Sequence, residues 1–369
     1  MRTNNYLWAM LAAATLTLTG CGSDENGIAE PQLQEKTAQL ELRLTGSGVN
    51  TKATGSALPT QAEENTLKRF TVAIFNSDNS VNAIRTITTN MTSATTINCT
   101  PAAGCTGIVV ANAPTDNYFA GVLNKTDFLK KTIALADAQA KDCLPMSGDV
   151  KDGSGNATFT LSAGSNTGMT AQLLRLVARV SVSSIKTAFD PNGQYAAASY
   201  ELKNIFVRNA MQEAVPGTGG YSTTKMSTPA YLTGNYDKST GTVAYLANSV
   251  TPPVDVSVEH KTNYWFYILP NEETTHTALV LEGTFKKNAS DAGSTIYYPI
   301  IVNKNQAGTN ITGTAGTSNI TRNNTYAIKA TIKNIGTTDP MGDITPTSLE
   351  LTVNVATWAL NITQNVTFD

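Results

Sequence analysis

The chain has 369 residues, a formal net charge of −2 and only 15% charged side chains, so nothing in its charge favours binding to nucleic acid. It holds 2 His and 4 Cys, and neither His260 nor His276 has the spacing of a metal ligand. Plentiful Thr, Asn, Ser and Gly favour a β-rich secreted protein over a cytoplasmic enzyme. We therefore expect no catalytic residue, no metal and no cofactor.

Residues 1–20 have the features of an export signal. An apolar run from Tyr6 to Leu18 follows a single charge at Arg2 and is too short to span a bilayer. It ends in Leu18–Cys21, a lipobox, which predicts cleavage before Cys21 and lipidation of that residue. The alternative is an ordinary signal peptide followed by a chance cysteine. Residues 22–36 are polar and indicate a tether.

The segment Thr37–Ala53 predicts a strand followed by an exposed leash. Ala38, Leu40, Leu42 and Leu44 alternate with polar residues, which is the period of a half-buried strand. A Gly-Ser-Gly turn and polar residues then lead to Lys52. A strand on a leash that a protease can cut is removable, and its removal opens an edge in the sheet.

The pattern in the body of the chain predicts many short strands separated by turns. The best helix candidate is Thr126–Ala140. This pattern predicts two β-sandwich-like domains with one or two short helices. The strands are expected at Leu67–Asn76, Val81–Thr88, Gly107–Ala113, Ala157–Leu161, Leu173–Ile185, Tyr200–Ala210, Tyr264–Pro270, Thr277–Lys286, Tyr297–Val302 and Thr325–Ile332.

Two pairs of side chains in the first half invite a functional interpretation. Cys99 and Cys105 can close a small disulfide loop outside the cytoplasm, or can remain as two thiols. Arg175 and Arg179 share a strand face and can form an anion site, but a solvated face or a structural ion pair is favoured.

The C-terminal segment predicts two strand pieces of opposite phase. Apolar residues have odd numbers from Leu349 to Val355 and even numbers from Trp358 onward, so the chain must bulge or bend near Ala356. The second piece can leave the subunit and add to the sheet of another copy, or it can complete its own domain. Its apolar residues are Trp358, Leu360, Ile362, Val366 and Phe368.

The order of these pieces resembles fimbrillin, the major subunit of type V pili, over nearly the whole chain. The matching pieces are the lipobox, the first strand and leash, LKRFTVAIFN, LLRLVARVSVSSI, YWFYILPN, TRNNTYAIKATIKNIG and LTVNVATWALNITQNVTF. The resemblance implies a lipoprotein precursor at the outer membrane, which a trypsin-like surface protease cuts just past the first strand. The tail of the adjoining subunit then fills the opened groove.

Carried over to this sequence, the resemblance places the cut after Lys52 and before Ala53. The family usually has arginine at this position, where this chain has lysine. Arg43 is a weaker alternative for the cut because it lies inside the strand. It implies the five apolar tail residues as donors, and as partners other copies of the chain and accessory pilus subunits. The implied organisation is a signal (1–20), a removable tether, strand and leash (21–52), and two sandwich domains of transthyretin-like or Greek-key type (53–185 and 186–369).

The leading hypothesis is therefore a stalk subunit of a surface fimbrium that supports adhesion and biofilm formation. One alternative is a pilus tip or anchor adhesin. The other is a surface glycan-binding lipoprotein, for which the tyrosines between 221 and 245 are the only hint.

Overall fold

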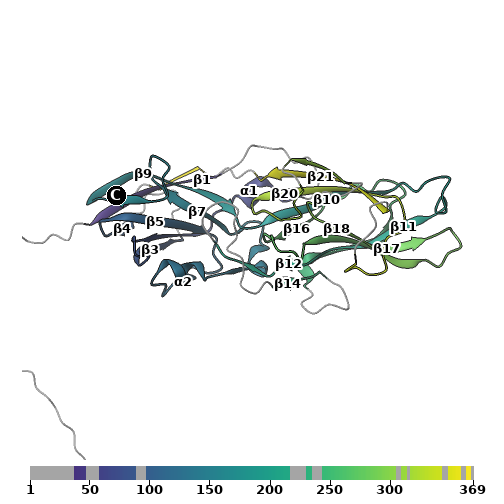
Figure 1. Cartoon of the computed structure of the whole chain (residues 1–369), viewed down its shortest axis with the longest axis horizontal. Coiled ribbons are helices and arrows are strands. Elements are labelled where there is room, and N and C mark those ends of the chain that lie inside the picture. The colour runs from purple at the N-terminus through teal and green to yellow at the C-terminus, as the bar shows by residue number, and fades with distance from the viewer. Residues whose placement is uncertain are drawn as a thin grey trace, which may run out of the picture. The chain divides into compact units, whose positions relative to one another are not determined.

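The structure is a computed structural model that describes residues 37–46, 58–88, 97–216, 230–234, 243–304, 309–313, 316–342, 348–358 and 363–366. It is mainly β, with two short α-helices in these ranges, which confirms the predicted fold class. None of the helices in the described ranges is long and apolar enough to cross a bilayer. Figure 1 shows the strands grouped into sheets that contain both early and late parts of the sequence.

The first sheet contains the leading strand. Its strands follow the order β22-β1-β9-β7-β5-β2-β3, with β4 paired to β1 and β8 paired to β5. The predicted first strand, the hairpin at residues 67–88 and the apolar run after Gly107 all belong to this sheet. The bounds are β1 Ala38–Gly46, β2 Phe70–Phe75, β3 Val81–Ile87, β4 Ile97–Cys99, β5 Ala102–Ala111, β7 Met146–Lys151, β8 Phe159–Leu161, β9 Gly164–Arg175 and β22 Thr363–Val366.

Two further sheets hold most of the later strands. One has the order β16-β10-β20-β21-β19 and the other β15-β11-β17-β18. The predicted strand at Leu173–Ile185 is split between two sheets, because β9 ends at Arg175 and β10 starts at Ala178 beside β16 and β20. The boundary at residue 185 and the sandwich type of each domain stay predictions. The bounds are β10 Ala178–Thr187, β11 Ser199–Arg208, β15 Ala247–Asp255, β16 Tyr264–Ile268, β17 Ala278–Lys286, β18 Ser294–Ile301, β19 Thr309–Gly313, β20 Asn324–Ile332 and β21 Leu349–Thr357.

The helix predicted at Thr126–Ala140 is much shorter in the structure. α2 covers Lys125–Leu129 and is capped by Asn124, whose side-chain oxygen accepts from the backbone N–H of Asp127 at 2.8 Å. The helical pattern stops because the next residues pair with a distant strand: β6 (Ile133–Ala134) lies antiparallel to β13 (Glu213–Ala214). The remaining elements are α1 Gln61–Glu64, η1 Leu135–Ala138, β12 Ala210–Met211, β14 Tyr231–Leu232 and η2 Ala244–Leu246.

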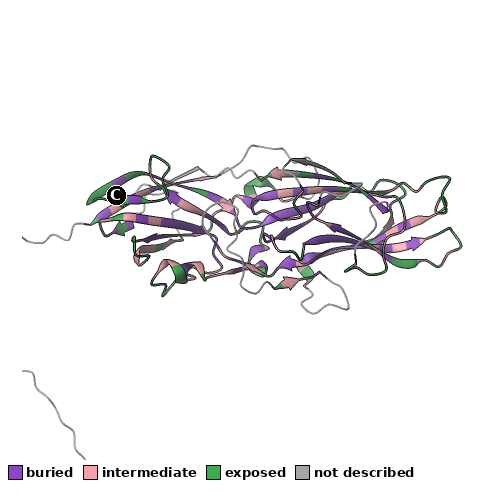
Figure 2. Cartoon of the chain, in the orientation of Figure 1, coloured by how far each residue is buried: buried purple, intermediate pink, exposed green. Residues whose placement is uncertain are grey.

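The core is built from the inward faces of these strands. Figure 2 shows buried residues running along the paired strands, and exposed ones concentrated at turns and strand ends. In β1 and β20 the inward residues alternate as the period-two pattern predicts. In the tail, Leu349, Leu351 and Val353 are buried at odd positions and Trp358 is buried at an even one, in agreement with the predicted change of phase.

Candidate functional site

The leading strand β1 lies inside its sheet, with partners on both edges. Along one edge it runs parallel to β9, from Ala38 opposite Gly164 to Gly46 opposite Leu173. Along the other edge it is antiparallel to β4 in its first half and to β22 in its second half. Figure 1 shows β1 beside β9, with the C-terminal segment alongside. Removing β1 therefore breaks its pairing with three strands at once.

The apolar face of β1 is completely enclosed. Ala38, Leu40, Leu42 and Leu44 each have 0% exposure, whereas Arg43 between them is exposed. At roughly 1.5–3 kcal/mol for each fully buried leucine side chain, the three leucines contribute about 5–9 kcal/mol to holding the strand in place. A groove left by β1 would thus be deep, apolar and unstable unless another strand filled it.

The register of β1 is fixed by an irregularity in its parallel partner. The pairing shifts between Leu40 and Leu42, where β9 contains one extra residue. At this point the side-chain amide of Asn166 donates to the backbone carbonyl of Gln39 at 3.2 Å, and its oxygen accepts from the N–H of Ser162 at 2.8 Å. Because a slip of one residue would turn the leucines outward, this bulge also specifies which residues any replacement strand must present.

Three of the predicted site residues lie outside the described residues. These are the lipidation site Cys21 and the two residues of the predicted cut, Lys52 and Ala53. Their roles stay predictions. The structure does describe elements on both sides of the predicted cut, since β1 ends at Gly46 and α1 begins at Gln61. The predicted leash thus falls between an enclosed strand and a short helix.

The predicted donor residues of the tail are described only in part. Leu360, Ile362 and Phe368 lie outside the described residues, and of Val366 only the backbone position is described, opposite Leu42 of β1. Trp358 is fully described: it follows β21 directly and its side chain is only 5% exposed. The structure therefore brings the end of the tail beside the leading strand of the same chain and buries the beginning of the tail elsewhere.

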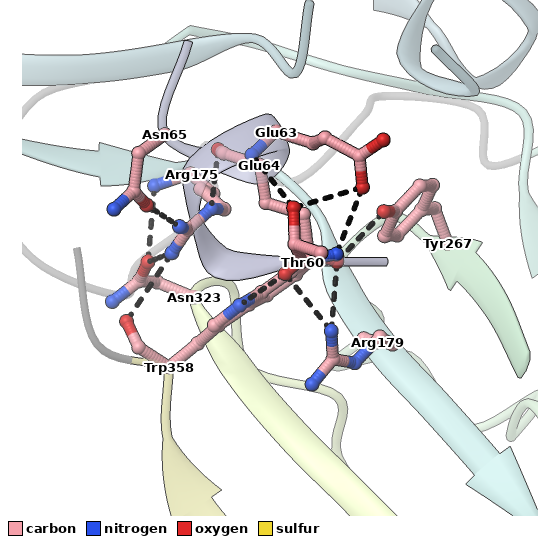
Figure 3. Close-up of polar contacts among 9 residues, drawn as sticks. All are labelled: Thr60, Glu63, Glu64, Asn65, Arg175, Arg179, Tyr267, Asn323 and Trp358. Carbon is pink, nitrogen blue, oxygen red and sulfur yellow. Dashed lines mark hydrogen bonds and ion pairs between the residues drawn. The ribbon is translucent and has the colours of Figure 1, made fainter. Parts of the chain in front are cut away.

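Trp358 is part of a buried polar cluster around Glu64 of α1 (Figure 3). The Glu64 carboxylate is 1% exposed and accepts from Arg179 Nη1 at 2.7 and 2.9 Å, from the Tyr267 hydroxyl at 2.7 Å and from Trp358 Nε1 at 3.1 Å. Three donors on one buried carboxylate satisfy its main hydrogen-bonding capacity. A buried ion pair whose partners are also hydrogen-bonded is costly to break, because either partner alone would be left uncompensated.

Arg175 completes the cluster from the end of β9 and has 0% exposure. Its Nη1 donates to the carbonyl of Trp358 and to the side chain of Asn323, each at 3.3 Å, and its Nε donates to the carbonyl of Glu64 at 3.2 Å. Burial lowers the pKa of Arg175 to about 10, which still leaves it cationic at neutral pH. Burial, followed by the nearby Glu64 charge, raises the pKa of Tyr267 far above its usual range, so its hydroxyl stays a donor.

α1 is held in a fixed orientation by its own cap. Thr60 and Glu63 form a capping box, with the Thr60 hydroxyl accepting from the Glu63 N–H at 3.3 Å and the Glu63 carboxylate accepting from the Thr60 N–H at 2.9 Å. This cap directs the next side chain, Glu64, into the core. The sequence predicted neither α1 nor the role of Glu64. The Thr-x-x-Glu spacing at residues 60–63 is the signal that would have located the helix start.

The structure decides between the interpretations of Arg175 and Arg179. Both side chains are buried, so the solvated face is wrong and the structural ion pair, between Arg179 and Glu64, is confirmed. Within the described ranges, no group of three or more His, Cys, Asp or Glu residues could hold a metal ion. Of the two histidines, His260 contacts the Tyr264 hydroxyl at 2.9 Å, and burial lowers its pKa.

Cys99 and Cys105 are both buried and carry free thiols in the structure. Burial raises the pKa of Cys99 to about 12 and also raises the pKa of Cys105. Each thiol lies near a backbone carbonyl, that of Ile97 at 3.8 Å and that of Ala102 at 3.5 Å. A disulfide between them stays a prediction.

A hollow of about 320 Å³ opens beside β16. It combines aromatic side chains with neutral amides, and none of the described residues that line it is acidic or basic. The lining includes Tyr245, Tyr264 and Trp265 as partly exposed aromatics, and Gln139, Asn248 and Asn263 as amides. Of the tyrosines between 221 and 245, Tyr221 and Tyr236 lie outside the described residues.

Comparison with known proteins gives a consistent result. Residues 38–183 match the family model described as major fimbrial subunit protein (FimA). The chain is 26% identical to the major fimbrium subunit FimA type-5 of Porphyromonas gingivalis, over 95% of this chain and 96% of that protein. It is 25% identical to the type-2 subunit of the same organism, over 97% and 98% of the two chains. The resemblance predicted from the sequence is confirmed.

Solved structures show the same fold. A fimbrilin from Porphyromonas gingivalis superposes with a TM-score of 0.66 at 20% identity, covering 88% of this chain and 99% of that one. A candidate cell adhesion protein from Parabacteroides distasonis gives a TM-score of 0.64 at 17% identity, covering 87% and 97%.

Proposed function

Given that this chain resembles FimA major fimbrial subunits in sequence over nearly its full length, we propose that it is a polymer-forming stalk subunit of a surface fimbrium. Each molecule gives up its leading strand β1, and the tail of the next copy takes the place of β1 in the groove. Accessory pilus subunits add to the same chain of subunits at its ends. The resulting fibre supports adhesion and biofilm formation.

The observation that carries this proposal is the position of β1. It is paired on both edges and its leucines are enclosed, yet the sequence predicts a leash directly after it. A strand that is paired on both edges is normally a permanent part of its sheet, and the chain after it does not need to be open to cleavage. A leash on such a strand is understandable if the strand holds the groove until another strand replaces it.

The route to the surface is proposed from the sequence. After removal of residues 1–20, Cys21 is lipidated and anchors the precursor at the outer membrane. Residues 22–36 then span the distance from the lipid to β1. Cutting the leash separates the lipid and β1 from the rest of the chain, so one cleavage both frees the subunit from its anchor and opens its groove.

The cut is proposed after Lys52, by a trypsin-like surface protease. Lys52 is the only basic residue between Arg43 and Lys68. Arg43 has an exposed side chain, but its backbone is paired on both sides, with Thr170 and with Asn365. A protease needs an extended, unpaired chain in its cleft, so Arg43 becomes accessible only if β1 leaves the sheet first.

The donor strand is proposed to be the end of the tail, with Leu360, Ile362, Val366 and Phe368 as the side chains that replace those of β1. At roughly 1.5–3 kcal/mol each, their burial contributes about 6–12 kcal/mol before entropy costs, comparable with the contribution of the β1 leucines. Exchange of one strand for another of similar apolar content is therefore close to balanced, and cleavage makes it irreversible.

Substitution at the cut tests the proposal. Lys52→Ala should leave a lipidated precursor that stays monomeric, whereas the matched exposed-lysine variant Lys151→Ala should polymerise normally. N-terminal sequencing of the wild-type surface polymer should then read from Ala53. Polymers of normal length from the Lys52→Ala protein, or a polymer that begins at lipidated Cys21, would contradict the proposal.

A second candidate function, binding of a glycan, is favoured by the hollow beside β16. Aromatic rings present flat apolar faces to sugar rings, and neutral amides supply donors and acceptors for hydroxyl groups. Trp265→Ala should abolish binding of the purified monomer on a glycan array. Absence of binding by the wild-type monomer would rule this function out.

A further inference from the structure

We infer that Trp358 is the fixed root of the tail: it stays buried in its own subunit while only the residues after it cross to the neighbour. This inference rests on the proposed strand exchange and narrows it. The sequence pattern groups Trp358 with the departing residues because it shares their phase. The contacts of Trp358 assign it the opposite role.

The backbone and indole of Trp358 are held by three separate parts of the chain. Its N–H donates to the carbonyl of Asn323 at 2.8 Å, ahead of β20. Its carbonyl accepts from Arg175 Nη1 at 3.3 Å, at the end of β9, and its Nε1 donates to Glu64 at 3.1 Å, on α1. Departure of this residue would leave a donor or an acceptor unsatisfied at each of these points.

The guanidinium groups of two buried arginines also lie against the indole ring. The guanidinium carbons of Arg175 and Arg179 lie 4.3 and 4.8 Å from the ring centroid, and the ring of Tyr267 stacks on it at 5.8 Å. Figure 3 shows these side chains gathered around Trp358 and Glu64. Without the ring, two buried cations would share one carboxylate beside an empty space, which is unfavourable for both charge and packing.

The end of the tail is held in a different way. Among the strands that the structure describes, β22 pairs with β1 alone. Loss of β1 therefore removes the backbone partner of residues 363–366. No residue of β1 belongs to the cluster around Trp358, and every member of the cluster follows the predicted cut at Lys52. The same cleavage thus releases the end of the tail and leaves its root in place.

The length of the tail fits this division. Eleven residues follow Trp358, and β1 has 9 residues. At about 3.3 Å per residue, the eleven residues extend to roughly 36 Å, enough to replace β1 along its length with a short connection to spare. The donor segment therefore begins at residue 359, and Trp358 is a positioning residue that sets where this segment begins.

Peptide competitors separate the two roles of Trp358 without disturbing the fold. A synthetic peptide of residues 357–369 is added to freshly cleaved subunits, and the concentration that halves polymerisation is measured. The same measurement is made with a Trp358→Ala peptide and with an Ile362→Ala peptide. We expect the Trp358→Ala peptide to inhibit within about threefold of the parent, and the Ile362→Ala peptide to be at least about tenfold weaker, because only Ile362 enters the groove.

Equal weakening by the two substitutions would overturn the inference and leave the strand exchange standing. Failure of the parent peptide to inhibit at any concentration would instead overturn the strand exchange itself. In the whole chain, Trp358→Ala should lower the unfolding midpoint of the uncleaved precursor, and Trp358→Phe, which keeps a ring between the arginines, should restore part of it. An unchanged unfolding midpoint in the Trp358→Ala precursor would also contradict the inference that Trp358 stays buried in its own subunit.

Discussion

At the scale of single residues, Glu64 is a buried carboxylate that accepts hydrogen bonds from three side chains. It is the carboxylate that Arg179 contacts directly, and Arg175 lies against the same helix end. Glu64→Gln would keep the shape of the side chain and remove its charge, leaving two buried guanidinium groups without a counter-ion. We expect the free energy of unfolding of the precursor to fall by about 3–5 kcal/mol, as measured by urea denaturation.

The adjacent residue provides the control for this prediction. Glu63 pairs with Lys141 at 2.7 Å on the surface, and its hydrogen bond to Lys141 is the main cause that lowers its pKa to about 2. Because this pair is solvated, Glu63→Gln should change stability little by comparison. A similar loss of stability in the two variants would mean that burial does not distinguish the two carboxylates.

Thiol reactivity provides a second prediction at the residue scale. Burial raises the pKa of Cys99 to about 12 from its usual value near 9, so the neutral thiol is favoured and the reactive thiolate is scarce even at pH 9. We expect iodoacetamide to modify the partly exposed Cys143 well before Cys99 in the native protein, read by peptide mass spectrometry. After unfolding, Cys99 and Cys105 should both react. Failure of both to react until a reductant is added would establish the disulfide instead.

The arginines illustrate what the sequence can and cannot predict about this cluster. The pattern placed Arg175 and Arg179 on one strand, whereas Arg175 ends β9 and Arg179 lies in β10; the pattern also favoured a structural role. It could not supply their partners, because Glu64, Tyr267 and Trp358 come from segments far apart in the sequence and no local spacing links them. Only the tertiary fold brings one carboxylate, one hydroxyl and one indole to the same place.

At the scale of elements, β1 has two faces that should respond differently to substitution. Leu42 has no exposed surface, whereas the neighbouring Arg43 is exposed. Leu42→Ala should lower the free energy of unfolding of the precursor by about 2–5 kcal/mol, since it removes buried atoms and leaves a cavity. Arg43→Ala should stay within about 0.5 kcal/mol of wild type, because the site lies at the surface. Comparable losses in urea denaturation would show that β1 is not enclosed.

Secondary-structure elements could be predicted from the sequence where their apolar residues recur with a single period. The alternation in β1 and β20 is regular, and both strands were predicted within a few residues. β2 was also predicted within a few residues, but all six of its residues are buried, so the inward alternation predicted for Phe70, Val72 and Ile74 is not observed. The segment 126–140 was predicted as one helix because its apolar residues recur at helical spacing. In the structure the pairing of β6 with β13 overrides that spacing, and the Thr132 hydroxyl donates to the Glu213 carboxylate at 2.6 Å beside it. Long-range pairing of this kind leaves no trace in a local window.

At the scale of the whole chain, the order of the elements links the proposed cleavage to the release of the tail. β1 precedes the leash and the cluster residues follow it, while β22 near the C-terminus returns to pair with β1. β1 and β22 therefore stabilise each other by backbone pairing. Separation of β1 from the rest of the chain removes a partner from β9 and from β22 together, so an open groove and a free donor arise in the same event.

Hydrogen exchange measures this link directly. In the precursor, residues 363–366 lie opposite Leu42–Thr45, so their paired amides should be protected. After cleavage and dissociation of the β1 peptide, we expect exchange in this segment to accelerate at least about tenfold, because its backbone partner is gone. Amides of β21 between Leu351 and Val353 should keep their protection, since β20 and β19 remain beside them.

Polymerisation should then restore the protection of residues 363–366, now through the sheet of the neighbouring subunit. This recovery distinguishes strand exchange from simple fraying of the C-terminus, which would persist in the polymer. If residues 363–366 stayed protected in cleaved subunits that had lost β1, the tail would have a second partner in its own subunit. Removal of β1 would then open the groove without supplying a donor, and assembly would require a separate step to free the tail.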